Sequence, residues 1–283
     1  MSETRMPRVG QVKEITSLAN PIVKDIKALA LKKFRDEQHA FMAEGLKLVI
    51  DALEGGWTIR TLIYSKAGRG NASVEKIASR TVALGGLVLE VSEKVLGAIT
   101  RRDNPQMVVG VFEQKLAKLA DIRLEAGDVW VALDRVRDPG NLGTIIRTVD
   151  AVGARGVILV GETTDPFSLE TVRATMGSVF SVPIARATPE AFLAWKAKAG
   201  AMLVGTHLKG SVDYRTPNYK GRPLVILMGN EQQGLPDELA RACDELVRIP
   251  QVGKADSLNL SVATGVMLYE VRRAALDIGD RLA

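Results

Sequence analysis

The chain has 283 residues, of which 46% are hydrophobic and 25% are charged. This length and composition predict a globular protein with a sizeable core, divided into two domains or built as one large domain. The single cysteine, Cys243, excludes an intramolecular disulfide and a multi-cysteine zinc site, and two histidines argue against a histidine-rich metal centre. No apolar stretch is long enough for a membrane span, and the first residues lack a secretory signal. We therefore expect a cytoplasmic, metal-free protein that does not enter a membrane.

The positive charge is concentrated in the first part of the chain. Residues 1–115 carry 18 basic and 13 acidic side chains, which accounts for the whole net charge of +5, and the remainder is neutral. Part of this excess is a close group of cations: Lys24, Lys27, Lys32, Lys33 and Arg35. Such a group suits a polyanion such as nucleic acid, but a solvated helix face explains it equally well.

The first 115 residues predict a small α/β domain that follows a polar, frayed stretch over 1–12. Apolar residues recur with helical spacing from Ser17, and a short strand over Ala40–Glu44 ends at the turn residue Gly45. The remaining predicted elements are a helix over Leu46–Leu53, strands over Thr61–Tyr64, Gly86–Val91 and Val108–Phe112, and a helix over Ser92–Ile99 with Ser92 as its N-cap.

A charged stretch without aromatic residues, 116–127, predicts a linker before a second domain over 128–283. Strands are predicted over Val129–Leu133, Gly156–Val160, Val182–Ile184, Ala201–Thr206, Leu224–Met228 and Glu245–Ile249. Helices are predicted over Asn141–Val152, Leu169–Thr175, Pro189–Ala199, Pro236–Arg241 and Ser257–Leu276. Short apolar runs that alternate with helices indicate a parallel sheet covered on both faces, whose ligand crevice lies beyond the carboxyl ends of the strands.

Three loops in the second domain combine glycines with polar residues directly after predicted strands. The first runs from Asp134 to Gly143; Asn141 is placed to cap the next helix, and Arg147 follows on that helix, where a surface salt bridge with Asp150 is the simpler explanation. In the second loop, Gly229 and Gly234 allow a close approach of the backbone to a ligand, and Asn230 and Glu231 are expected to point towards it.

The third loop, Ile249–Ser261, gathers polar residues at the start of a helix. We expect Ser257 to be the N-cap of this helix. Asn259 would then lie in the first turn of the helix, where asparagine has poor helix propensity. The sequence contains no P-loop motif of the usual form. It also lacks an early G-x-G-x-x-G fingerprint, which argues against a nicotinamide-dependent oxidoreductase.

Taken together, the three loops resemble those of the SpoU–TrmH family of S-adenosylmethionine-dependent RNA 2′-O-ribose methyltransferases, within the SPOUT superfamily. The matching motifs are D-P-G-N-L-G-x-x-x-R (Asp138 to Arg147), M-G-N-E-Q-Q-G-L (Met228 to Leu235) and I-P-x-x-G-x-x-x-S-L-N-L-S-V-A (Ile249 to Ala263). The N-terminal part is similar to the small ribosomal-protein-like RNA-binding domain that often precedes this domain, on the segments Ile15–Pro21 and Phe41–Gly45.

The resemblance implies a parallel-sheet domain with a trefoil knot, a homodimer, and S-adenosylmethionine bound in the knot. The cofactor contacts that it implies are Thr206, Gly229, Ile249 and Leu258, and the RNA contacts that we expect in the first domain are Lys24, Lys32, Lys33 and Arg35. The N-terminal domain favours ribosomal over transfer RNA as the substrate.

The family assigns the activation of the ribose hydroxyl to the arginine that matches Arg147. Because guanidinium does not normally lose its proton in proteins, we interpret Arg147 as a cation that stabilises the developing negative charge. Asn141 and Glu231 would orient Arg147 or the sugar, and Ser257 and Asn259 would hydrogen-bond the cofactor or the ribose. The main alternative is a non-catalytic RNA-binding or ribosome-assembly protein with the same fold.

Overall fold

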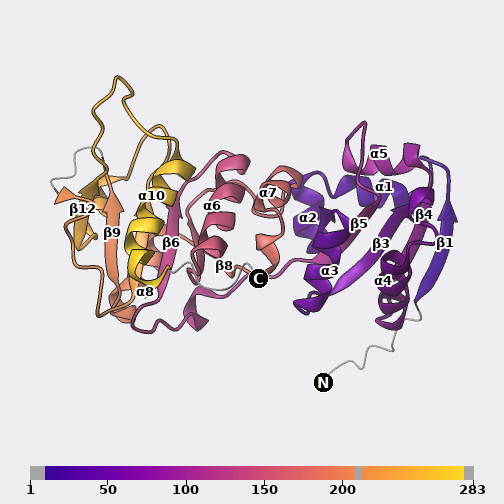
Figure 1. Ribbon diagram of the computed structural model, residues 1–283, viewed down its shortest axis with the longest axis horizontal. Helices are drawn as coiled ribbons and strands as arrows, with labels where there is room; N and C mark the ends of the chain where they lie inside the picture. The colour runs from indigo at the N-terminus through magenta and orange to yellow at the C-terminus, as the bar shows by residue number, and fades with distance from the viewer. Residues whose placement is uncertain (1–9, 208–211, 277–283) are drawn as a thin grey trace. The chain divides into compact units, whose positions relative to one another are not determined.

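The computed structural model describes residues 10–207 and 212–276, which belong to two compact units (Figure 1). Unit 1 contains the chain up to Gln114 and, in addition, the segment Phe167–Phe180. Unit 2 contains Lys115–Pro166 and the chain from Ser181 onward. The chain therefore enters unit 1 a second time, between two parts of unit 2. The domain bounds 1–115 and 128–283, with a linker over 116–127, stay a prediction.

Unit 1 is built on a mixed sheet of five strands in the order β1-β4-β3-β5-β2. Strands β1 and β3 lie parallel to β4, and β5 lies antiparallel to β3 and β2. The strands are β1 (Gln11–Ile15), β2 (Ala40–Glu44), β3 (Ile59–Ser65), β4 (Leu87–Val91) and β5 (Val108–Glu113). The α-helices of unit 1 are α1 (Pro21–Ala28), α2 (Lys32–Gln38), α3 (Leu46–Glu54), α4 (Ala72–Ala83), α5 (Glu93–Thr100) and α7 (Leu169–Thr175).

Most of these elements match the sequence prediction, including the N-cap of α5, where Ser92 Oγ accepts a hydrogen bond from the backbone N–H of Val95. Strand β1 and helix α4 were not predicted from the sequence. Four of the five residues of β1 are exposed, so its sequence lacks an apolar face. A frayed stretch was predicted over residues 1–12, of which residues 1–9 lie outside the described residues. The prediction is wrong for Gln11 and Val12, which belong to β1.

Aromatic side chains join the re-entering segment to the sheet of unit 1. The rings of Phe41 and Phe167 lie 4.7 Å apart, and the ring of Phe180 packs against Trp57 at 5.1 Å. Trp57 Nε1 also donates a 2.8 Å hydrogen bond to the carbonyl oxygen of Phe180. The side chains of Phe41 and Phe167 are fully buried, so the segment Phe167–Phe180 contributes to the core of unit 1 rather than covering its surface.

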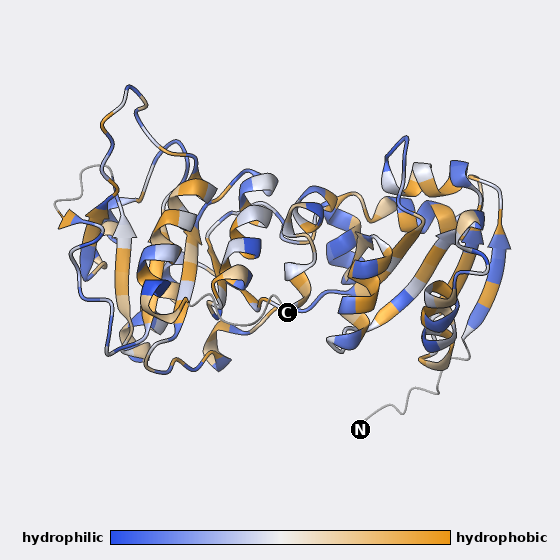
Figure 2. Ribbon diagram, viewed as in Figure 1, coloured by the Kyte–Doolittle hydropathy of each residue, from blue (hydrophilic) through white to orange (hydrophobic). Residues whose placement is uncertain are grey.

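Unit 2 is built on seven parallel strands in the order β10-β12-β9-β11-β6-β7-β8. Every residue of its central strands β6, β7 and β11 is buried, and the visible part of β9 is largely hydrophobic in Figure 2. The strands are β6 (Val129–Asp134), β7 (Gly156–Val160), β8 (Ile184–Ala187), β9 (Met202–Thr206), β10 (Val212–Asp213), β11 (Leu224–Met228) and β12 (Glu245–Arg248). The α-helices are α6 (Pro139–Ala151), α8 (Pro189–Ala199), α9 (Asp237–Arg241) and α10 (Leu260–Arg272), and α10 packs against α6.

The predicted α/β class with a C-terminal parallel sheet is confirmed, and the trefoil knot stays a prediction. Several element bounds need correction, and the short strand β10 was not predicted. Strand β8 spans Ile184–Ala187 rather than Val182–Ile184, because Pro183 precedes it. Helix α6 starts at Pro139, and α10 starts at Leu260 and ends at Arg272 rather than spanning Ser257–Leu276. Within residues 10–207 and 212–276, no helix combines the length and the apolarity needed to cross a bilayer.

Candidate active site

The predicted site residues of unit 2 follow strands that are neighbours in its sheet. Strands β12, β9, β11 and β6 are adjacent in that order, and all run in the same direction. Thr206 ends β9, Gly229 directly follows β11, and Ile249 directly follows β12. The carboxyl ends of adjacent parallel strands meet at one edge, so the three loops come together where an open α/β sheet binds its ligand.

The first loop leads into α6 through an aspartate cap. Asp138 is the N-cap, and its Oδ1 accepts a 2.6 Å hydrogen bond from the backbone N–H of Asn141. The expectation that Asn141 caps this helix is therefore wrong. Pro139 takes the first helical position, where its missing N–H has no cost, so the helix begins two residues earlier than predicted. The side chain of Asn141 is consequently available for other partners.

The third loop leads into α10 through Asn259 rather than through Ser257. Asn259 Oδ1 accepts hydrogen bonds from the backbone N–H groups of Ser261, at 2.9 Å, and Val262, at 3.3 Å. Asparagine is among the best N-cap residues, which removes the apparent conflict with its poor propensity inside a helix. Ser257 lies two residues before this cap and is exposed.

Hydrogen bonds between side chains connect the three loops in one line. Asn259 Nδ2 donates to Asn141 Oδ1 at 2.9 Å, and Asn141 Nδ2 donates to Glu231 Oε1 at 3.3 Å. These residues are 90 and 118 positions apart in the sequence. The arrangement fixes the orientation of both amides, because each one donates to a defined acceptor. Three of the five predicted catalytic residues are therefore brought together, on the solvent-accessible side of the loops.

Arg147 lies on α6 with its side chain exposed, and it makes no hydrogen bond or ion pair with any described residue. The salt bridge with Asp150 that would explain it as a surface residue is thus not formed within the described chain. The structure does not join Arg147 to the line of Asn259, Asn141 and Glu231. Its guanidinium is free to meet an anionic group of a substrate.

Three of the four predicted cofactor residues, Thr206, Gly229 and Ile249, lie at the carboxyl ends of β9, β11 and β12. Thr206 Oγ1 donates to Met228 Sδ at 3.4 Å, and Leu258 is half-buried before the cap of α10. Gly229 is required by its loop: a Cβ there would lie 2.4 Å from the carbonyl carbon of Gly234. The chain therefore folds back tightly at Gly229, and the second loop keeps its backbone close to the strand ends.

The loop after β12 offers backbone groups that can hold a ligand. In residues 250–258, which follow Ile249 beyond the end of β12, the backbone C=O groups and, apart from Pro250, the backbone N–H groups make no hydrogen bond to another described residue. Free peptide groups of this kind can pair with the edge of an adenine ring, which both donates and accepts. The residues present therefore fit S-adenosylmethionine.

Asn230 does not point towards a ligand, contrary to the sequence-based expectation. Its Oδ1 accepts from the backbone N–H groups of Gln232 and Gln233, and its Nδ2 donates to the carbonyl oxygen of Arg135 at 2.9 Å. The side chain of Asn230 therefore stabilises the conformation of the second loop. The sequence could not indicate this role, because Arg135 lies 95 positions away.

Neither a reactive thiol nor a metal cluster is found among the described residues. Burial raises the pKa of the Cys243 thiol to about 12, which keeps it protonated and poorly nucleophilic near neutral pH. Among the described residues, no group of three His, Cys, Asp or Glu side chains is placed to hold a metal ion.

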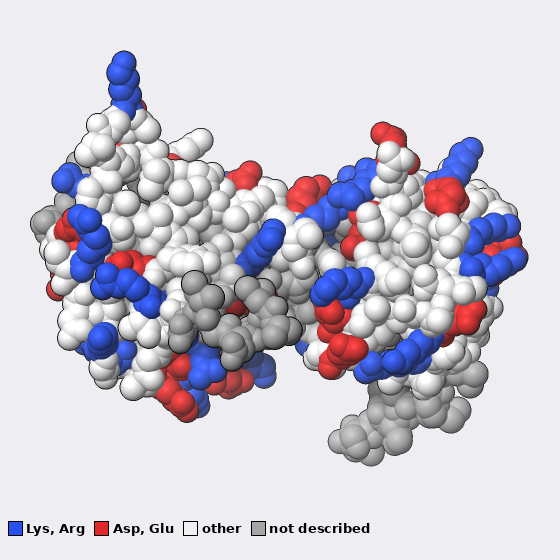
Figure 3. Space-filling view, in the orientation of Figure 1, with Lys and Arg blue, Asp and Glu red and all other residues white. Residues whose placement is uncertain are grey.

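The predicted RNA-contacting cations of unit 1 divide into two groups. Lys24, Lys32 and Lys33 are exposed on α1 and α2. Arg35 is only 4% exposed, and its Nη1 donates a 2.8 Å hydrogen bond to the carbonyl oxygen of Leu29, so it supports the turn between these helices rather than presenting its charge to RNA. On the face in Figure 3, basic side chains alternate with acidic ones and form no continuous patch.

Comparison with known families gives two matches that together cover most of the chain. Residues 128–269 match the SpoU rRNA Methylase family, and residues 20–110 match the MRM3-like substrate binding domain. A similar curated protein is the 23S rRNA (guanosine(2553)-2′-O)-methyltransferase RlmP of Bacillus subtilis. It is 31% identical over 92% of this chain and 100% of its own length.

Two similar crystal structures were solved with S-adenosylmethionine (AdoMet). One is the AdoMet-bound rRNA methyltransferase from Sinorhizobium meliloti, which is 68% identical with a TM-score of 0.91 and covers 95% of this chain and 100% of its own. The other is the SpoU methyltransferase AviRb from Streptomyces viridochromogenes, which is 31% identical with a TM-score of 0.80 and covers 90% of this chain and 98% of its own. The family that the three loop motifs predicted is confirmed: the chain belongs to the SpoU rRNA methylase family.

Proposed function

We propose that this protein transfers a methyl group from S-adenosylmethionine to a ribose 2′-hydroxyl of ribosomal RNA. The observation that carries this proposal is the line of hydrogen bonds from Asn259 through Asn141 to Glu231, which joins the three family motifs at one edge of the parallel sheet. The AdoMet-bound relatives support the cofactor, and the 23S rRNA 2′-O-methyltransferases among the relatives support ribosomal over transfer RNA.

The reaction requires that a weakly acidic hydroxyl become a nucleophile. When it is bound, the cofactor supplies an electrophilic methyl group on a sulfonium. Arg147 stabilises the negative charge that develops on the 2′-oxygen while the hydroxyl proton passes to solvent, because a guanidinium keeps its own proton and can also hold the adjacent phosphate. Asn141 and Glu231 orient the ribose. Asn259 and Ser257, which lies two residues before it, form hydrogen bonds with the cofactor or the ribose.

The cofactor is held by the loops that follow β9, β11 and β12. Thr206 and Gly229 line the site from two adjacent strands, and Ile249 and Leu258 bracket the segment with free peptide groups. Backbone recognition of this kind depends on the course of the loop, and the trefoil knot implied by the family is a way of fixing that course.

Unit 1 binds the RNA substrate in this proposal, with Lys24, Lys32 and Lys33 as phosphate contacts. The protein acts as a homodimer, and two apolar side chains on the exposed face of α10 support this: Val262 is 52% exposed and Tyr269 is 55% exposed, seven residues apart on one helix. Because ribosomal RNA is its substrate, the expected location is the cytoplasm.

Incubation with S-adenosylmethionine carrying a labelled methyl group and with transcripts of ribosomal RNA tests the proposal. We expect one labelled nucleotide, identified by ribonuclease digestion and mass spectrometry, and no product when that nucleotide is a 2′-deoxynucleotide. A protein that binds ribosomal RNA but shows no heat of binding with S-adenosylmethionine in calorimetry would instead be a non-catalytic RNA-binding protein.

Replacing Asn259 with serine should separate the two roles of this residue. Serine still caps α10, so the thermal unfolding temperature should stay nearly unchanged, but serine cannot donate an amide N–H to Asn141. We expect kcat to fall about tenfold or more, the size usual for a lost orienting contact. Asn259→Ala, which removes both roles, should in addition cost about 1 kcal/mol of stability. Full activity of Asn259→Ser would contradict an orienting role.

A further inference from the structure

The backbone of Arg135 has a conformation that side chains other than glycine rarely adopt. Its φ is 48°, in the left-handed region, directly after the last residue of β6. Its backbone N–H donates to the carbonyl oxygen of Val160 at 3.0 Å, which fixes it at the sheet edge. A strained residue persists only where its surroundings hold it there, and such residues concentrate at functional sites. The contacts of Arg135 are therefore informative.

One side of the Arg135 guanidinium is fixed by a buried charge. Its Nε and Nη2 both donate to Asp134 Oδ2, at 3.0 and 2.9 Å. The side chain of Asp134 is 1% exposed, and its other oxygen has no hydrogen-bond partner among the described residues. Moving the guanidinium away would leave the negative charge of Asp134 buried and uncompensated, which costs a large free energy. The ion pair therefore holds the Arg135 side chain in place.

The other side of the guanidinium contacts the second loop. Nη1 donates to Gln233 Oε1 at 2.7 Å, and Nη2 lies 3.5 Å from the carbonyl oxygen of Gly234. The carbonyl oxygen of Arg135 accepts the amide N–H of Asn230. Arg135 therefore contacts the loop at both of its ends, which are themselves joined by backbone hydrogen bonds between Asn230 and Gly234.

Glu231 lies inside this clamped loop, and its contact with Asn141 is sensitive to the position of the loop. The distance from Asn141 Nδ2 to Glu231 Oε1 is 3.3 Å, near the outer limit of a hydrogen bond, so a small outward shift of the loop would break it. Gly229, by contrast, is buried and packed against the backbone of the same loop, so its position depends less on the clamp.

We propose that Arg135 and Gln233 are positioning residues that hold Glu231 in hydrogen-bonding reach of Asn141. This inference rests on the proposed function, because it concerns the same site. It makes the bond from Arg135 to Gln233 a determinant of turnover rather than of cofactor affinity.

The experiment compares two adjacent glutamines in the full-length protein. Gln233→Met keeps the length of the side chain and removes the acceptor for Arg135, without uncovering the buried charge of Asp134. Gln232→Met is the matched control, because the Gln232 side chain makes no hydrogen bond with a described residue. We expect Gln233→Met to lower kcat about tenfold, with less than about a twofold change in the Kd of S-adenosylmethionine measured by calorimetry. Gln232→Met should behave as the unchanged protein does.

A third variant tests whether the contact with Arg135 is responsible. Gln233→Glu restores an acceptor, now charged, and should return kcat to within about a factor of two of the unchanged protein. Equal kcat for the Met variants at 232 and 233, or equal losses in the Met and Glu variants at 233, would overturn the inference. These outcomes require that the unchanged protein methylates ribosomal RNA; if it does not, the proposed function itself fails.

Discussion

Replacing Arg147 with alanine is expected to lower kcat at least about 10³-fold, the size found when a group that stabilises transition-state charge is removed. The Kd of S-adenosylmethionine should change little, because the proposed cofactor residues lie on other loops. The unfolding free energy should also stay within about 0.5 kcal/mol, since the side chain is exposed and has no partner among the described residues. Steady-state methylation of ribosomal RNA, calorimetry with the cofactor and denaturant unfolding measure the three quantities.

Two further variants sharpen this experiment. Asp150→Ala changes another exposed charge on the same helix and should leave kcat unchanged. Arg147→Lys keeps the charge but loses the planar pair of donors, so it should recover only part of the activity. Methylation by Arg147→Ala at a rate near that of the unchanged protein would remove Arg147 from the reaction. Loss of the fold in this variant would show that Arg147 has a structural role.

The central strands of unit 2 could be predicted from the sequence because they are buried on both faces, whereas the two-residue strand β10 at the sheet edge was not predicted. Every residue of β6 and β11 is buried, and the sequence shows unbroken apolar runs over Val129–Leu133 and Leu224–Met228. The edge strand β1 has one buried residue, and nothing in its pattern distinguishes it from a polar loop. Helix α4 was missed because its sequence, ASVEKIASRTVA, contains few strongly apolar residues.

The convergence of the three loops was predictable for a similar reason, whereas the contacts between them were not. Parallel strands bring their following loops to one edge whatever the loop sequences are. Three-dimensional geometry decides which side chain caps a helix and which side chain forms a hydrogen bond with another loop. Both Ser257 and Asn259 satisfy the sequence rule for an N-cap, and only the structure shows that Asn259 does so while it also contacts Asn141. The contact between Arg135 and Gln233 left no signal in the sequence.

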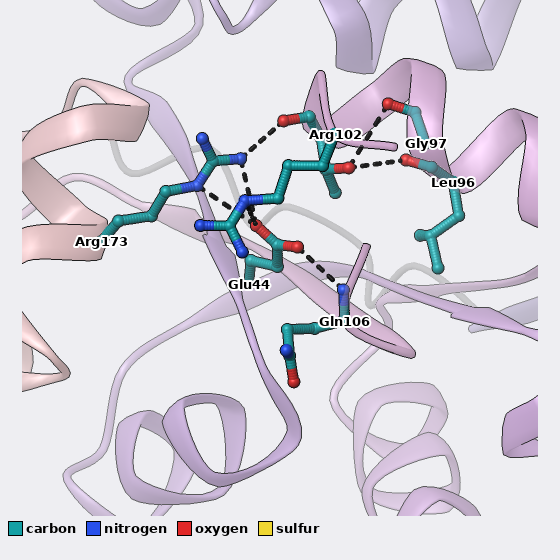
Figure 4. A network of polar contacts seen from close by, with 7 residues as sticks. Glu44, Leu96, Gly97, Arg102, Gln106 and Arg173 are labelled. Carbon is teal, nitrogen blue, oxygen red and sulfur yellow. Dashed lines mark hydrogen bonds and ion pairs between the residues drawn. The ribbon is translucent and has the colours of Figure 1, made fainter. Parts of the chain in front are cut away.

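A large loss of stability is expected in unit 1 when the ion pair between Glu44 and Arg173 is removed. This ion pair joins β2 to the segment Phe167–Phe180, which re-enters unit 1. Glu44, at the end of β2, has a side chain that is 5% exposed, and its Oε2 accepts from Arg173 Nη2, on α7, at 3.1 Å (Figure 4). Arg173 Nη2 also donates to the carbonyl oxygen of Thr100. A 3.6 Å ion pair with Arg102 and the backbone N–H of Gln106 complete the surroundings of this carboxylate.

Arg173→Met should therefore destabilise unit 1 by about 2–4 kcal/mol, because it leaves a buried carboxylate with only part of its compensation. Hydrogen exchange followed by mass spectrometry can measure this locally, and we expect peptides from β2 and α7 to lose protection together. Lys47→Met is the matched control, since it breaks an exposed ion pair of the same unit, with Asp51 at 2.7 Å, and exposed pairs contribute little.

Adding Glu44→Gln to Arg173→Met removes the uncompensated charge and should recover part of the lost stability, which a double-mutant cycle quantifies. Recovery would show that the cost of the single variant comes from the buried charge rather than from lost packing of the arginine side chain. If Arg173→Met instead leaves the exchange of both β2 and α7 unchanged, the ion pair with Glu44 does not hold the segment Phe167–Phe180 in place, and its core contacts, including those with Phe41 and Trp57, are sufficient.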